Sequence, residues 1–461
     1  MSDLRAIGGG LSRRQALKSA GIGFGHLALA GLLGPGSGRA VAAPADGPGP
    51  LAPKPPVLPA RAKRIIFLFM QGATSQMDTW EYKPKLQRDD GKVGPGGGTL
   101  TGSKFKFAQH GQTGTWVSEL YPHTAKHVDK FCFLRGLHTD TPAHPQAVIQ
   151  LHTGTALASL TRPSMGSWLL YGLGTENQDL PGYVTINPPP NFGGAVNYGS
   201  AFLPAHFQGT RINDVGYVPN LKAQSAGPLQ RRQLDLIQSM NRDLASHPTA
   251  PDQLDGVIQS YELAFKMQGK VPELLDISKE PQSILDEYGV QPGPAGSFAR
   301  QCLMARRLSE SGVRFVEVCH PGWDQHNNLH QGLIRNSKAT DQPTAALLAD
   351  LERRGLLDET LVLFGSEFGR LPTSQGPDGR DHNITGYPMW MAGAGIKAGY
   401  SHGGTDEYGL NALEGRMHTT DLHATILALM GLDHEQLTYR YAGRNFRLTD
   451  VAGNVAREVS A

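Results

Sequence analysis

Carboxylate, imidazole and guanidinium side chains recur in four short segments of the C-terminal half of the chain. These segments read GWDQHNNLH, GSEFGR, GRDHN and HTTDLH. Imidazole nitrogens and carboxylate oxygens together are the ligands that a borderline divalent ion prefers. A single histidine or aspartate in a loop is usually a turn residue or a cap, but the density of these groups favours a functional site. The candidate residues are Asp324, His326, His330, Glu367, Arg370, Arg380, Asp381, His382 and His418.

Short apolar runs directly precede two of these segments, and such runs are typical of strands buried on both faces. Helical patterns alternate with the runs, which predicts an α/β fold with a mostly parallel central sheet and helices on both faces. Ligands of such sheets collect at the carboxyl ends of the strands, so we expect the candidate residues to meet there. The predicted strands cover 65–70, 313–319, 361–364 and 387–391, and the predicted helices cover 299–310, 344–353 and 421–430.

Between about 229 and 288 the pattern becomes helical, with proline-bearing breaks between the helical stretches. We interpret this segment as a helical insertion within one α/β domain over 61–461. The net charge of +2, with 18% charged residues, provides no basic field and argues against nucleic acid as a partner.

Residues 1–43 resemble a twin-arginine export signal. Arg13 and Arg14 lie in SRRQALK, an apolar run follows over 20–33, and Ala-Val-Ala at 40–42 offers a small-residue cleavage site. The apolar run has roughly fourteen residues, too few to span a bilayer comfortably. We therefore expect a periplasmic or otherwise exported protein with no transmembrane span after signal removal, and a flexible Pro- and Gly-rich linker over 44–60.

The segment TDTPAHPQAVIQLHTG at 139–154 resembles the nucleophile segment of the sulfatase branch of the alkaline-phosphatase superfamily. Counted back from Thr153 and Gly154, the cysteine that sulfatases oxidise to formylglycine corresponds to His144, with Thr141 three residues earlier. More narrowly, the words MQG, LHTG, GSEFGR, GRDHN and LTYRYAGR resemble an uncharacterised sulfatase-like family of twin-arginine-exported bacterial proteins. These words extend from about residue 65 to the C-terminus.

The chain departs from the sulfatase pattern at several ligand positions. Gln71 replaces the first aspartate, for which Asp78 is a possible substitute, and Glu367 and Phe368 replace the Asp-His/Asn pair. The second metal site of the phosphatase branch is better represented. The resemblance implies Asp324 with His326 or His330, together with His418, as ligands of a divalent ion, which we expect to be zinc, manganese or calcium.

In the implied mechanism the ion lowers the pKa of a bound water and orients it for in-line attack. Arg370 and Arg380 would bind the anionic group of a sulfate or phosphate ester, such as a sulfated or phosphorylated glycan. Glu367 or His382 would act as general base or acid, with Asp381 orienting the imidazole. His144 would be a nucleophile, a ligand or an acid–base group. The alternative is a catalytically inactive relative that binds an anionic glycan or a cell-envelope partner.

Overall fold

The computed structural model describes residues 49, 51–157, 160–218, 221, 227–245, 247, 254–293 and 295–461. The predicted export signal at 1–43 lies outside the described residues, as does the first part of the predicted linker. The rest of that linker is held against the domain, since the Lys54 amide donates to the Leu173 carbonyl at 2.9 Å and the Val57 amide to the Gly431 carbonyl at 2.8 Å. In the described part of the chain, no helix combines the length and apolar character needed to cross a membrane.

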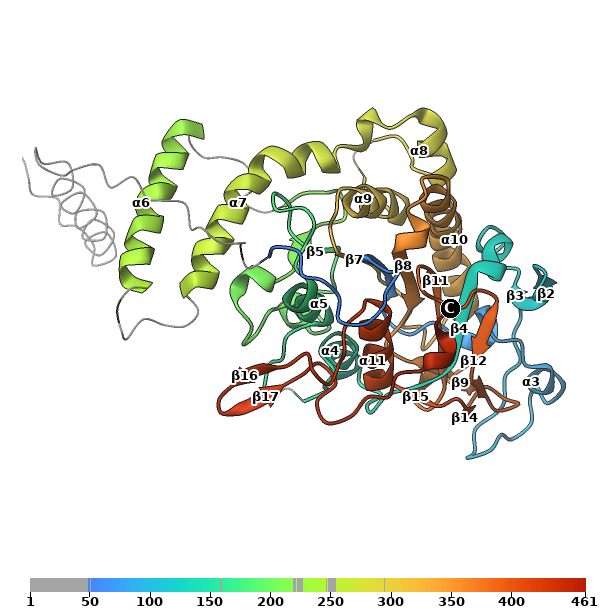
Figure 1. Cartoon of the computed structure of the whole chain (residues 1–461). Helices are drawn as coiled ribbons and strands as arrows, with labels where there is room; N and C mark the ends of the chain where they lie inside the picture. Colours follow the sequence, from blue (N-terminus) through green and yellow to red (C-terminus); the bar gives the residue numbers. More distant parts are fainter. Residues whose placement is uncertain are drawn as a thin grey trace, which may run out of the picture. The chain divides into compact units, whose positions relative to one another are not determined.

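A nine-stranded sheet forms the centre of the domain, in the order β12-β4-β11-β8-β1-β7-β5-β6, with β15 also pairing with β4 (Figure 1). Strand β11 is antiparallel to both of its neighbours, β4 and β8, so these two run in the same direction as β1 and β7. The mostly parallel sheet is thereby confirmed. The strands are β1 (Arg64–Met70), β4 (Phe131–His138), β5 (Tyr183–Ile186), β6 (Thr210–Ile212), β7 (Phe315–His320), β8 (Thr360–Gly365), β11 (Tyr387–Gly393), β12 (Tyr400–His402) and β15 (Met417–His418).

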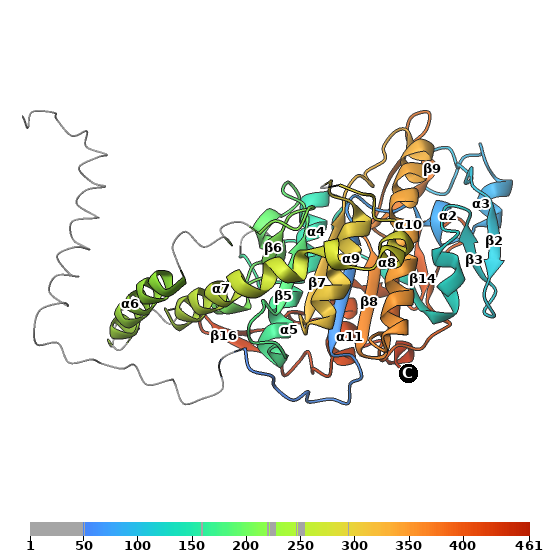
Figure 2. The same cartoon turned by 90° about the horizontal axis from the view of Figure 1, so that it is seen from above.

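Strand β1 shows why an unbroken apolar run becomes a central strand. Ile66, Leu68 and Met70 enter one hydrophobic core, and the alternating residues Ile65, Phe67 and Phe69 enter a second core on the other face. The first core is closed by α9 (Phe298–Glu310) and α10 (Leu329–Arg353), and the second by α4 (His144–Thr153), α5 (Met165–Leu173) and α11 (Thr419–Leu429) (Figures 1 and 2). Helices therefore cover both faces, as predicted.

The segment expected to be a helical insertion contains α6 (Gly227–Ala245), α7 (Leu254–Leu275) and α8 (Gln282–Tyr288). Helix α6 packs on α7, where the buried Gln238 side chain donates to the Ile258 carbonyl at 2.7 Å and Arg231 pairs with Glu262 at 2.8 Å. Strands β4, β5 and β6 were not predicted. The apolar part of β4 is confined to Phe131–Leu134, and β5 and β6 have only 4 and 3 residues, so periodicity alone does not separate these runs from loops.

Candidate metal centre

Four loops and one hairpin meet at the carboxyl edge of the sheet. Because β1, β4, β7 and β8 run in the same direction, the residues that follow them come together at one end. The hairpin of β9 (Gly369–Ser374) and β10 (Arg380–Asn383) follows β8 and adds a fifth element. Gly379 allows this hairpin to dock, because a Cβ there would lie 1.9 Å from the His326 carbonyl oxygen.

Three histidines surround one carboxylate at this edge. The Nε2 atoms of His144, His326 and His382 lie 3.1, 2.9 and 3.5 Å from Asp324 Oδ1. One potential ligand atom from each of the four residues lies within 4.8 Å of the others. Three imidazole nitrogens and a carboxylate oxygen are a donor set suited to a borderline divalent ion. We refer to these four residues as the metal cluster.

The opposite nitrogen of each imidazole meets an oxygen acceptor. A carboxylate or carbonyl oxygen opposite Nδ1 places the proton there and leaves the Nε2 lone pair directed at the cluster. The buried Nε2 atoms of His144 and His382 make no hydrogen bond, so a cation would supply the partner that they lack. The acceptors are Glu367 Oε1 at 2.7 Å from His144, Gln375 Oε1 at 2.5 Å from His326 and the Pro142 carbonyl oxygen at 2.6 Å from His382.

The electrostatics of the cluster favour a bound positive charge. Burial opposes ionisation of Asp324, but the close contacts with His144 and His382 and the hydrogen bond from Arg370 hold the pKa of its carboxyl well below the usual value. Burial likewise lowers the pKa of His144, whereas its contacts with Asp324 and Glu367 outweigh this effect and raise it to about 9. In the absence of metal the cluster thus holds a proton at neutral pH, and metal binding would displace it.

Glu367 and Arg370, both on the segment after β8, fix the loops that carry the ligands. Glu367 accepts the Gly72 amide at 2.9 Å in addition to His144. Gly72 has a φ of 109°, and a Cβ there would lie 2.5 Å from the Asp324 amide nitrogen, so only glycine lets these two loops approach so closely. The Glu367 carboxylate therefore positions His144 and the loop after β1 together.

The two arginines predicted to bind the substrate anion are buried instead. Arg370 is 0% exposed and Arg380 is 1% exposed. Arg380 donates to the Asp78 carboxylate at 2.9 Å and to two backbone carbonyls, so neither guanidinium presents a free edge to solvent. The partners of Arg370 are Asp324 Oδ1 and the carbonyl oxygens of Gly72, Ala73, Trp323 and Arg380. Both arginines thus hold the loops together, in place of the predicted contact with a substrate anion.

His418, a predicted ligand, is not part of the metal cluster. Its Nε2 lies 3.0 Å from Asp140 Oδ1, and its Nδ1 accepts the Thr420 amide at the start of α11. The carboxylate of Asp421 completes this cap by accepting the His418 amide, which agrees with the structural role considered for such an aspartate. The cluster therefore takes its further nitrogen ligands from α4 and the β9–β10 hairpin.

Four other candidate residues lie beside the cluster or apart from it. His330 stacks on Phe105 with ring centroids 4.7 Å apart. The Asp78 carboxylate pairs with Arg380 and accepts a hydrogen bond from the Ser75 hydroxyl. Thr141 accepts the Ala143 amide at 3.2 Å. Asp381 accepts the backbone amide of His382 rather than its imidazole, and lies 3.9 Å from His326 Nδ1. Of the residues predicted as metal ligands, Asp324, His326 and His144, for which a ligand role was one of the alternatives, belong to the cluster.

Sequence reasoning missed Gln375 and Pro142, whose oxygens orient two of the imidazoles. A glutamine in a glycine-rich loop and a proline carbonyl carry no recognisable signal of this role. His144 was found only because of the family register, since no metal-ligand spacing links it to residues near 324 or 382.

A second histidine–glutamate pair lies in the core behind the cluster. His152 in the last turn of α4 contacts Glu317 in the middle of β7 through Nε2, and its Nδ1 donates to the Val148 carbonyl at 2.7 Å. Thr185 donates to the other oxygen of Glu317 at 2.8 Å. Both members of the pair are almost fully buried, so they have no access to a substrate.

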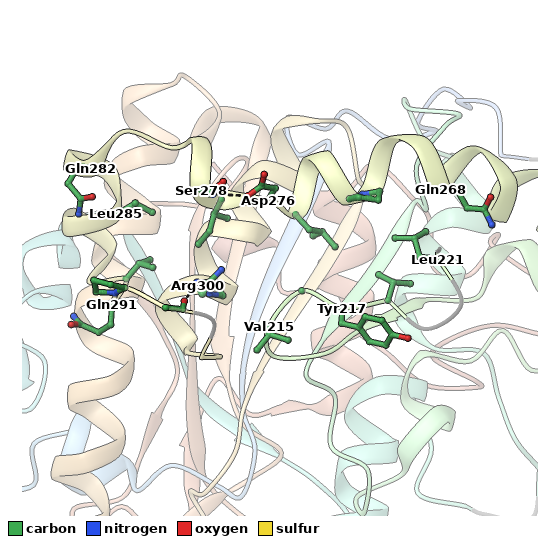
Figure 3. Close-up of a pocket in the computed structure, with 18 residues that line it drawn as sticks. Val215, Tyr217, Leu221, Gln268, Asp276, Ser278, Gln282, Leu285, Gln291 and Arg300 are labelled. Carbon is green, nitrogen blue, oxygen red and sulfur yellow. Dashed lines mark hydrogen bonds between the residues drawn. The ribbon is translucent and has the colours of Figure 1, made fainter. Parts of the chain in front are cut away.

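A cavity of about 830 Å³ lies elsewhere, between α7, α8 and the loop after β6 (Figure 3). Tyr217, Leu221 and Leu285 contribute to its largely apolar wall, with Arg300 at one side. No member of the metal cluster lines it. One of its lining residues, Leu221, has sequence neighbours outside the described residues, and we assign the cavity no role.

Comparisons with known proteins place the chain in a family. No curated protein matches it. Similar solved structures include a protein in the alkaline phosphatase superfamily from Vibrio parahaemolyticus (10% identity, 83% of this chain and 70% of that chain, TM-score 0.39). A second is the lipoteichoic acid synthase LtaP from Listeria monocytogenes (9% identity, 87% of this chain and 76% of that chain, TM-score 0.37). A third is the PsFucS1 sulfatase from Pseudoalteromonas sp. (14% identity, 81% of this chain and 69% of that chain, TM-score 0.34). With scores this low, the α/β assignment rests on the strands and helices of this chain itself. A family model described as protein of unknown function (DUF1501) matches residues 62–460, and the chain belongs to that family.

Proposed function

We propose that this protein is an exported, metal-dependent hydrolase of sulfate or phosphate esters that works without a formylglycine nucleophile. The observation that carries the proposal is the convergence of three Nε2 lone pairs on Asp324, each imidazole being oriented by an acceptor at Nδ1. Convergent, pre-oriented nitrogens of this kind are the pattern of a metal site rather than of a solvated surface.

The residues present fit a transition metal better than calcium. Calcium takes six to eight oxygen ligands, whereas this cluster offers three nitrogens and one carboxylate. We therefore propose zinc or manganese ahead of calcium. A divalent ion at this position would supply Lewis-acid activation of a water molecule and of the ester oxygen.

The protein groups act mainly by orientation. Glu367 holds His144, and Arg370 holds the Asp324 carboxylate at 2.8 Å, so the ligands keep their positions with little rearrangement. The twin-arginine-like N-terminus supports the exported location, because this route carries folded proteins that are often loaded with metal beforehand. The resemblance of residues 139–154 to the sulfatase nucleophile segment supports the ester class.

One observation favours the alternative, a non-catalytic protein that binds an anionic glycan or an envelope partner. Both arginines expected to neutralise charge in the transition state are fully engaged with protein groups. Metal analysis and turnover together separate these functions, because a protein that only binds would hold no hydrolytic activity in any metal-loaded state.

The test uses the purified full-length protein, elemental analysis and chromogenic sulfate and phosphate esters with added zinc or manganese. Asp324→Asn and His382→Ala should lose both the ion and the turnover. His330→Ala is a matched control, since this histidine lies in the same segment as Asp324 but outside the cluster, and it should retain both. A folded wild type that binds neither metal would rule out the proposal, and bound metal without turnover of any ester would favour the binding protein.

A further inference from the structure

The charges around the metal cluster restrict the anion that it can accept. A sulfate monoester or a phosphodiester carries one negative charge, whereas a phosphate monoester carries nearly two at neutral pH and above. Enzymes that bind dianions generally offset the second charge with a further cation, most often an arginine that binds two oxygens. The preference of this site between the two kinds of anion therefore depends on which charged groups can face a substrate.

Neither arginine of the site can fill that role. Arg370 donates to Asp324 and to four backbone carbonyls, and Arg380 donates to Asp78 and to two. Both lie below the loops that carry the ligands, with at most 1% of their surface exposed. Freeing either guanidinium would leave several buried carbonyl oxygens without a donor, which is costly.

Two exposed carboxylates belong to the segments that carry or orient the ligand His382. Asp381 stands on β10 next to the ligand His382, its side chain is 52% exposed, and its Oδ1 lies 3.9 Å from His326 Nδ1. Asp140 is 63% exposed and precedes by two residues Pro142, whose carbonyl oxygen orients His382. An anion that approaches the cluster past either residue thus meets negative charge.

A formal count leads to the same conclusion. The three imidazoles are neutral when they bind metal, Asp324, Glu367 and Asp381 are negative, and Arg370 is positive. A divalent ion would bring the sum of these charges to zero. Coordination by the ion can hold one anionic oxygen, but the groups counted here provide no excess positive charge for a second.

We propose that the site selects monoanionic esters, that is sulfate monoesters or phosphodiesters, over dianionic phosphate monoesters, and that Asp381 is the residue that disfavours the second charge. This inference rests on the proposed function. Removal of one negative charge should favour a dianion by twice the electrostatic energy that it gives a monoanion. The ratio of the two affinities therefore reports on Asp381 directly.

The experiment measures binding of two non-hydrolysable ligands to the zinc-loaded full-length protein by calorimetry at pH 8. The ligands are phenylphosphonate, a dianion, and its monomethyl ester, a monoanion. We expect the wild type to bind the monoanion more tightly. Asp381→Asn keeps an oxygen acceptor for the His382 amide and should shift the affinity ratio towards the dianion by about three- to tenfold at low salt. The shift should shrink as ionic strength rises.

Asp235→Asn is the matched control, because this aspartate is similarly exposed but lies on α6, and its substitution removes the same charge. It should leave the ratio unchanged. Tighter binding of phenylphosphonate by the wild type, or an unchanged ratio in Asp381→Asn, would overturn the inference. Turnover of phosphate monoesters in preference to sulfate monoesters and phosphodiesters would overturn this inference but leave the proposed function in place. Failure of both ligands to bind, with zinc present and no ester turned over, would overturn the inference and the proposed function together.

Discussion

Helix α4 carries a histidine at each end, and the two lie in opposite surroundings. His144 in the first turn and His152 in the last turn each contact a glutamate that comes from the sheet or its carboxyl edge. At His144 the glutamate occupies Nδ1 and leaves Nε2 for the metal cluster. At His152 the glutamate occupies Nε2 and a backbone carbonyl occupies Nδ1. The same pair of residue types thus orients a candidate metal ligand at the start of α4 and is packed inside the core at its end.

A free ring nitrogen, rather than the histidine–glutamate pair itself, therefore distinguishes the candidate ligand from the core residue. Both histidines are buried, and in both cases contact with a carboxylate raises the pKa of the imidazole against the effect of burial. A search for histidines with a raised pKa would select both residues alike. Only His144 has a nitrogen that faces other ligand atoms and lacks a hydrogen bond.

Exchange of each histidine for alanine should separate the two roles most clearly. His144→Ala removes a ligand, and we expect the dissociation constant for zinc to rise by more than about 100-fold. His152→Ala should leave that constant nearly unchanged while lowering the melting temperature. Competition with a chromophoric chelator measures the affinity, and circular dichroism confirms folding. Equal loss of zinc by a folded His152→Ala variant would contradict the distinction.

Substitutions in the His152–Glu317 pair should change the stability of the fold, whereas substitutions in the metal cluster should change metal binding. Glu317→Ala leaves an imidazole buried without its carboxylate, and we expect a loss of about 3–5 kcal/mol in the free energy of unfolding in urea. The double substitution His152→Leu with Glu317→Leu should recover much of this loss, because it removes both polar groups from the core. A double variant as unstable as the single one would show that the pair is needed for packing rather than for charge.

The outer acceptors of the cluster should have a smaller effect. Gln375→Leu removes the oxygen that holds Nδ1 of His326, and we expect zinc affinity to fall by about 10- to 100-fold. Gln375→Glu keeps an acceptor at that place and should bind zinc at least as tightly as the wild type. If the leucine variant bound zinc like the wild type, the orientation of His326 would have to come from elsewhere.

The smallest expected effect concerns pH. The pKa of His152 is higher in the folded protein than its usual value of 6.5, despite burial, because of Glu317. A raised folded pKa gives stability that is fully present below 6.5 and is lost as pH rises through the folded value. Relative to the double leucine variant, the wild type should therefore lose stability as pH rises above 6.5. Urea unfolding at several pH values measures this difference, and an increase with pH would contradict it.

The sequence predicted the elements better than the site because the two depend on different information. The apolar run at 65–70 is typical of a strand with both faces buried, and the glycine-bearing loops after β7 and β8 were expected at one edge of the sheet. The direction of a side chain after a turn has no comparable pattern. Arginine is usually exposed, so nothing in GSEFGR indicates that Arg370 lies beneath the loops. His418 could be a cap or a ligand, and only the geometry of α11 shows the cap.

The position of Arg370 has a consequence for how the centre opens. Its guanidinium joins the loops after β1 and β7 to the β9–β10 hairpin through hydrogen bonds to their carbonyl oxygens. Displacement of any one of these segments would break part of this set and leave the buried cation incompletely paired, which is costly. Amide protons in this region, including that of Gly72 bound by Glu367, should therefore exchange with deuterium in a single cooperative event. In the proposed function, a substrate would accordingly bind over a fixed floor formed by these segments.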